Sequence, residues 1–198
     1  TQRPLEPLFE VRVLGGEPIW RASAAKSPKR TRFRGYSQAV TEPASDAPAR
    51  PGLVVVLAAG AGTRMKSDLA KVLHPILGRP LLGHVLASVA QTQPHNVVVV
   101  VGHQREQVEQ YLAQEFPGVR TAVQVEQNGT GHAVRCALEG LAAQGVELGA
   151  EPVIVLAGDT PLISSDTLTD LVATHTRTHA AVTVLSAELN DPFGYGRI

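Results

Sequence analysis

The sequence has little of several features that define whole classes of protein. Its 198 residues include one cysteine, Cys136, which excludes a disulfide framework and favours a reducing compartment. It has no run of about 18 apolar residues, so we expect no membrane span and no membrane partner. The net charge is zero, which argues against a nucleic-acid partner because dedicated binders carry a basic surplus. With few aromatic residues as well, the composition is ordinary for a soluble α/β protein, and the reducing compartment that the single cysteine favours leads us to expect a cytoplasmic protein.

The basic residues that are present gather in the first fifty positions. Residues 1–50 contain nine Lys/Arg and five Asp/Glu, and the stretch 22–52 is rich in Ala, Ser, Pro and Arg. Such a composition cannot bury a core, so we expect residues 1–50 to be a disordered or non-native extension. Arginine and serine are also compatible with a transit peptide, but the acids and prolines argue against one.

From Leu53 onward, short apolar runs alternate with segments of helical periodicity. The runs at 53–58, 96–102, 119–125, 152–159 and 180–187 predict five strands, and the segments 81–92, 104–116, 131–145 and 164–179 predict helices, the last capped by Ser165 or Asp166. Strands that are apolar throughout, separated by helices, are typical of a doubly wound, mostly parallel sheet. Ligands bind such sheets beyond the carboxyl ends of the strands, after Leu57, Val125 and Leu156 here.

A glycine-rich turn in "LVVVLAAGAGTRM", residues 53–65, follows the first of these strands. It does not fit the dinucleotide fingerprint, since Met65 occupies the third glycine position and no acid closes the next strand. A P-loop is excluded because no Gly-Lys-Ser/Thr follows. Arg64 and Lys71 place two cations beside the turn, and this combination favours a triphosphate ligand.

Four motifs together carry a more specific indication. "LAAGAGTRMKSDLAKVLHPILGRPLL", "QVEQNGTGHA", "LAGDTPLI" and "DPFGYGRI" resemble, in this order, the N-terminal uridylyltransferase domain of the bifunctional bacterial enzyme that makes UDP-N-acetylglucosamine. The resemblance covers residues 51–198. It implies a Rossmann-like nucleotidyltransferase fold that is incomplete at the C-terminus.

The resemblance implies a reaction in which N-acetylglucosamine 1-phosphate attacks the α-phosphate of UTP and pyrophosphate leaves, assisted by Mg²⁺. Family members trimerise through a C-terminal domain that lies beyond residue 198. Further sugar contacts and a second metal ligand also lie there, so we expect this chain to have little activity alone.

The resemblance also assigns roles to individual residues. Leu57, Ala58, Ala59 and Gly60 match positions that contact the nucleotide, and Gly62 and Thr63 continue the turn around the phosphates. Arg64 and Lys71 match the catalytic cations. Gln124, Gly129 and Thr130 match the positions around the uracil ring, and Asp159 matches the metal ligand, flanked by Ala157 and Gly158. Gly196 matches a glycine that faces the sugar.

Several other residues are more simply interpreted as structural. His175 and His179 are four apart on a predicted helix but lack a third metal ligand, and Cys136 fits a small core position. Gln127 matches either a base contact or a residue that orders the loop, and His132 fits a loop-ordering role. Ala70 stands where many relatives have proline, and His74 is left open.

Two other functions remain compatible with these motifs. One is transfer of a different nucleotide, from CTP, GTP or dTTP, to another sugar phosphate. The other is a nucleotide-binding fragment without catalytic activity.

Overall fold

The computed structural model describes residues 8–13, 20–22, 50–62, 65–188 and 193. It divides into two compact units, 49–172 and 1–48 with 173–198, which are described separately. The elements in chain order are β1 (Leu8–Val13), β2 (Trp20–Ala22), β3 (Leu53–Leu57), η2 (Lys71–Leu73), β4 (Pro75–Ile76), β5 (Arg79–Pro80), α1 (Leu81–Gln91), β6 (Asn96–Val101), α2 (Arg105–Glu115), β7 (Arg120–Val123), α3 (Thr130–Ala143), β8 (Val153–Ala157), α4 (Ser165–Thr178) and β9 (Thr183–Glu188).

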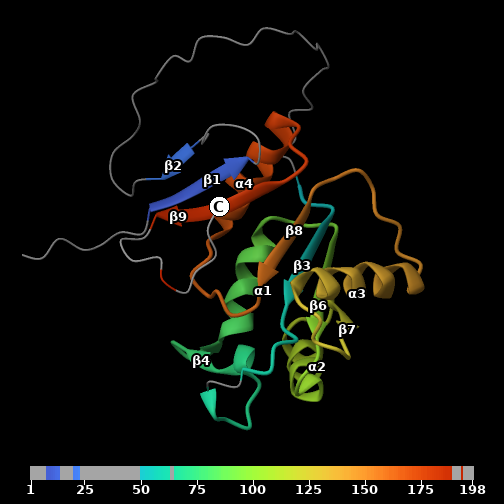
Figure 1. Ribbon diagram of the computed structural model, residues 1–198. Helices are drawn as coiled ribbons and strands as arrows, with labels where there is room; N and C mark the ends of the chain where they lie inside the picture. Colours follow the sequence, from blue (N-terminus) through green and yellow to red (C-terminus); the bar gives the residue numbers. More distant parts are fainter. Residues whose placement is uncertain (1–7, 14–19, 23–49, 63–64, 189–192, 194–198) are drawn as a thin grey trace, which may run out of the picture. The chain divides into compact units, whose positions relative to one another are not determined.

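A four-stranded sheet forms the centre of the unit 49–172 (Figure 1). Its order is β7-β6-β3-β8, and every neighbouring pair is parallel. Leu57 lies beside Val100 on one side and Ala157 on the other, so the carboxyl ends of the strands meet at one edge. The predicted α/β fold with a mostly parallel, doubly wound sheet is confirmed.

Helices pack on both faces of this sheet because successive side chains of a strand point to opposite faces. On one face, α1, α2 and α4 pack against alternate strand residues such as Val54, Val56 and Val99. On the other face, α3 packs through Ala133, Ala137 and Leu141 against Leu53, Val55 and Val98. The central strand β3 and most of β6 are buried on both faces, which explains their continuous apolar runs, whereas the edge strand β8 exposes Val153 and Val155 on one face.

The predicted strand at 180–187 is present as β9, but its expected place in the parallel sheet is wrong. Strand β9 pairs antiparallel with β1, and β1 pairs antiparallel with β2 in the same three-stranded sheet. Strand β9 has the polar residues Thr183, Ser186 and Glu188 among apolar ones, and such a mixed strand suits an antiparallel sheet. Because β1 and β2 lie within 1–50, these nine residues also differ from the expected disorder. The domain boundary at residue 50 stays a prediction.

The predicted helices are present, with two corrections at the ends of α4. The helix begins after Ser164, whose Oγ accepts a hydrogen bond from the Thr167 N–H at 3.1 Å, so the cap is Ser164 and not Ser165 or Asp166. It ends at Thr178, and His179 adopts a left-handed φ of 48° outside the helix. His175 and His179 therefore do not share a helix. In the described part of the chain, every helix is too short or too polar to cross a bilayer.

Candidate functional site

The loop that follows β3 is fixed by backbone hydrogen bonds before it reaches the glycine turn. The Ala58 N–H donates to the Val100 carbonyl at 2.9 Å, and the Ala59 carbonyl accepts from the His103 N–H at 3.3 Å. Ala58 and Ala59 are both buried. The loop therefore leaves the sheet along a defined path, and Gly60, which is exposed, is the first residue to emerge.

Two of the predicted phosphate-site residues, Gly62 and Lys71, lie directly against each other. Gly62 has a φ of +57°, which side chains rarely adopt, and a Cβ built on it would lie 2.8 Å from the Lys71 Cβ. The stem of Lys71 thus packs on the backbone of the turn. Only glycine meets both requirements at this position, the left-handed conformation and the close approach.

The ammonium group of Lys71 reaches across to the end of a different strand. Its Nζ lies 2.5 Å from the Asp159 Oδ2, in an ion pair whose side chains are 41% and 30% exposed. Asp159 follows β8, where the Gly158 N–H donates to the Leu57 carbonyl at 2.9 Å. A Cβ on Gly158 would lie 3.0 Å from that carbonyl, so glycine allows the ends of β3 and β8 to approach. Ala157, at the last position of β8, is exposed.

The residues expected around the base lie together at the ends of β7 and α3. Gln124 is 4% exposed, and its Nε2 donates to the Gly129 carbonyl at 3.1 Å. Gly129 caps α3 with φ 88° and ψ 177°, a conformation essentially restricted to glycine, and Thr130 is exposed in the first turn. Gln127 donates to the Ala59 carbonyl at 3.0 Å, which favours its loop-ordering role over a base contact.

His132 lies between Gln124 and the backbone of the loop that precedes α3. Its Nδ1 lies 3.2 Å from the Gln124 Nε2 and 2.9 Å from the Glu126 carbonyl oxygen. A protonated Nδ1 donates to Glu126, whereas an unprotonated Nδ1 accepts from Gln124, so the tautomer decides which bond forms. The Cys136 Sγ lies 3.6 Å from the Nε2 of the same ring. The expectation that His132 orders the loop agrees with these contacts.

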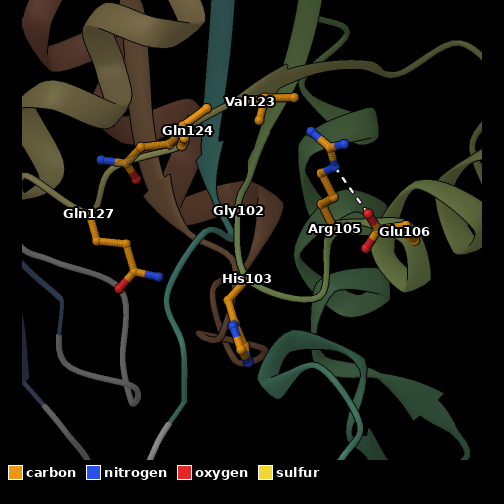
Figure 2. A pocket seen from close by; sticks show the side chains of 8 residues that line it. Gly102, His103, Arg105, Glu106, Val123, Gln124 and Gln127 are labelled. Carbon is orange, nitrogen blue, oxygen red and sulfur yellow. Dashed lines mark hydrogen bonds and ion pairs between the residues drawn. The ribbon is translucent and has the colours of Figure 1, made fainter.

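An open cleft of about 330 Å³ lies at the ends of β6 and β7. Figure 2 shows Gln124 and Gln127 on one side of Gly102 and the Arg105–Glu106 pair on the other. The pKa of Glu106 is held below its usual value by a hydrogen bond from its own backbone N–H and by the Arg105 guanidinium. The cleft is therefore polar, with carboxamides on one wall and an exposed ion pair on the other.

The structure thus forms two groups of predicted site residues. The expected phosphate site contains Gly62, Lys71 and Asp159. The expected base site contains Ala59, Gln124, Gln127 and Gly129. Both groups are joined through the loop that follows Leu57. Thr63, Arg64 and Gly196 lie outside the described residues. Among those described, no three His, Cys, Asp or Glu side chains gather to hold a metal ion.

A parallel sheet with a glycine turn and a cation–carboxylate pair at its carboxyl edge is an arrangement that suits the nucleotidyltransferase class, and the family match shows that class. Residues 54–197 match the family of MobA-like NTP transferase domains, and the chain belongs to that family.

Curated relatives give a more specific likeness. The chain is 62% identical over 149 residues to the bifunctional protein GlmU of Streptomyces avermitilis, and 60% identical over 149 residues to that of Thermobifida fusca. Each match covers 75% of this chain but only 30% and 31% of those proteins. These relatives confirm the resemblance inferred from the four motifs.

The solved structure of a UDP-glucose pyrophosphorylase from Acinetobacter baumanii has the same fold. It is 18% identical, with a TM-score of 0.52 over 67% of this chain and 54% of that one.

Replacing Gly62 by alanine tests whether the turn and Lys71 form one packed unit. We expect Gly62→Ala to lower the free energy of unfolding by about 1–3 kcal/mol, because it adds both strain and a contact with Lys71. Urea denaturation measures this loss. Gly118→Ala is the control, since no heavy atom lies within 4 Å of its added Cβ and its φ is not positive. Equal stability of the two variants would show that the turn can move away from Lys71 at no cost.

Proposed function

We propose that this site transfers a uridylyl group from UTP to N-acetyl-α-D-glucosamine 1-phosphate. A phosphate oxygen of the sugar attacks the α-phosphorus of UTP, the bond from that phosphorus to the β-phosphate bridging oxygen breaks, and pyrophosphate leaves. The observation that carries the proposal is the Lys71–Asp159 pair beside the Gly62 turn, at the same strand edge as Gln124. The product, UDP-N-acetylglucosamine, is a precursor of peptidoglycan.

In this proposal, the glycine turn and the two cations hold the phosphates. Backbone N–H groups after Gly60 bind the β- and γ-phosphates, and Arg64 neutralises the charge that develops on the departing pyrophosphate. Lys71 contacts phosphate oxygens near the reacting centre. Fixed donors and charges of this kind lower the barrier to phosphoryl transfer, because they need no reorganisation during the reaction. A general base is not needed, since the attacking phosphate is already anionic.

The residues present fit a divalent metal that enters with the nucleotide. Asp159 is a partly exposed carboxylate at the same strand edge as the glycine turn, which suits an ion that also binds substrate phosphates. Mg²⁺ keeps several waters and binds through one or two carboxylates together with substrate phosphates. Asp159 would hold it, and the ion would neutralise charge on those phosphates. The ion pair with Asp159 also directs the Lys71 ammonium toward the proposed position of these phosphates.

The part of the site that would bind the sugar is assigned only by the family resemblance, through Gly196. The chain spans about 30% of the length of the GlmU relatives that it matches. The trimer and the low activity expected of this chain alone stay predictions.

Base selection tests the proposed nucleotide. With its Nε2 directed at Gly129, the Gln124 carboxamide presents its Oε1 to a ligand. An acceptor there suits the N3–H of uracil and opposes the bare N3 of cytosine. We therefore expect UTP to bind more tightly than CTP by about 1–3 kcal/mol.

Calorimetric titration of this chain with the two triphosphates measures that difference. Gln124→Ala should reduce the preference more than it weakens overall affinity, while Gln114→Ala, exposed on α2, should leave both unchanged. Equal affinities for UTP and CTP in the unmodified chain would mean that Gln124 does not select the base, and tighter binding of CTP would favour a transferase that uses another nucleotide.

A further inference from the structure

The loop that leads from the glycine turn to Lys71 is exposed but not free. Residues 65–69 are all exposed, and Lys66 has a left-handed φ of 44°. Nevertheless, the Lys71 ammonium at the end of this loop meets Asp159 at 2.5 Å. Contacts other than burial must therefore fix the path of the backbone.

Two glutamines at the start of α2 supply these contacts. The carbonyl oxygen of Asp68 accepts hydrogen bonds from the Gln104 Nε2 at 2.7 Å and from the Gln107 Nε2 at 2.9 Å. The Gln107 Oε1 accepts from the Ala70 N–H at 2.9 Å. Gln107 thus binds the backbone on both sides of Leu69, because its side-chain N–H donates to Asp68 and its side-chain oxygen accepts from Ala70.

The residue that Gln107 binds, Ala70, directly precedes Lys71 and therefore constrains its backbone. Ala70 is buried, and its carbonyl accepts from the Leu73 N–H at 2.8 Å to begin the turn η2, in which Val72 and Leu73 are also buried. With Ala70 fixed on one side and the turn on the other, the direction of the Lys71 Cα–Cβ bond is set. The stem then runs along Gly62 toward Asp159.

Gln104 makes its hydrogen bond to Asp68 from a strained backbone conformation. Gln104 adopts a left-handed conformation, with φ 53° and ψ 35°, at the position before α2. A non-glycine residue rarely adopts this conformation, and glycine would do so without strain. The bond that the Gln104 side chain makes to Asp68 offsets part of this strain.

We infer that Gln104 and Gln107 are positioning residues that hold Lys71 in front of Asp159. Their effect on turnover rests on the function proposed above, whereas their effect on the Lys71 side chain does not. An amide is needed at 107 because a carboxylate would accept from Ala70 but repel the Asp68 carbonyl. Methionine retains the size and helix propensity of glutamine and makes neither bond.

The first test measures Lys71 itself, without any substrate. The chain is labelled briefly with an amine-reactive ester, and modification at Lys71 and at the exposed Lys66 is quantified by mass spectrometry. In Gln107→Met, we expect Lys71 to react severalfold faster relative to Lys66, and the Ala70 amide to exchange with solvent faster. Asp159→Asn is the positive control for release of Lys71, and Gln114→Met, exposed on the same helix, is the negative control.

The second test measures coupling in turnover. Under single-turnover conditions with UTP and the sugar phosphate, Gln107→Met should reduce the rate about tenfold, with little change in UTP affinity, because orientation and not binding is lost. In the Lys71→Ala background, the same substitution should have no further effect. A residue that only stabilises the fold would reduce the rate equally in both backgrounds.

Three results would overturn the inference: unchanged Lys71 labelling in Gln107→Met, unchanged Ala70 exchange, or additive losses in the double variant. If Gln107→Met does not fold, Gln104→Met replaces it, since that change removes only one of the three bonds. If the chain transfers no nucleotide at all, the proposed function fails, and labelling and exchange still decide whether the glutamines position Lys71.

Discussion

Asp159→Asn is expected to remove the dependence of UTP binding on Mg²⁺ and to lower the rate of transfer by about a thousandfold, a loss of several kcal/mol of charge stabilisation. The substitution keeps the shape of the side chain but removes the charge that faces both Lys71 and the phosphates. The fold should be little affected, because a pair whose side chains are 41% and 30% exposed contributes about 0–1 kcal/mol.

Titration of UTP with and without Mg²⁺ measures the metal dependence of binding, single-turnover transfer measures the rate, and thermal unfolding measures the stability of the fold. Asp170→Asn is the matched control, since Asp170 is an exposed carboxylate on α4. If Asp159→Asn still binds UTP more tightly when Mg²⁺ is added, the metal is held elsewhere and the role assigned to Asp159 is wrong.

Lys71→Ala should lower the transfer rate by about a hundredfold or more, since one fixed donor to a developing anion is typically worth about 3–4 kcal/mol. Lys71→Arg should restore little of this. Its stem fits along Gly62, but a planar guanidinium cannot replace a compact ammonium at the same distance from Asp159.

Rapid-quench measurement of uridylyl transfer distinguishes the variants. Lys66→Ala is the control, because Lys66 is exposed on the same loop and close to Lys71 in sequence. A rate in Lys71→Ala within twofold of the unmodified chain would mean that Lys71 only pairs with Asp159 and does not act on the phosphates.

The sequence predicted most of the fold because the relevant patterns are local. Continuous apolar runs identified β3, β6 and β8, and Pro117-Gly118 marked the end of α2 at Glu115. The partner of β9 was not predictable in the same way, since strand pairing depends on segments far apart in the chain. The hairpin of β4 and β5 was also missed, because its turn places Leu77 at a positive φ of 50° beside Gly78.

The sequence was sufficient to predict at which strand ends the residues of the candidate site lie. The rule that ligands bind at the carboxyl edge of a parallel sheet predicts that Gly62 and Asp159 lie at the same edge. The contacts that organise the site were not predictable. Gln107 to Asp68 and Gln127 to Ala59 are bonds from side chains to distant backbone, and no spacing in the sequence marks them.

Transfer of label from UTP to the sugar phosphate tests the central claim most directly. The chain, in excess over UTP labelled at the α-phosphate, is incubated with N-acetylglucosamine 1-phosphate and Mg²⁺, so that slow transfer is still detected. We expect label to appear in UDP-N-acetylglucosamine only when all three components are present, and to disappear in Asp159→Asn. A chain that binds UTP but forms no labelled product under these conditions, or forms it equally without Mg²⁺, would contradict the account.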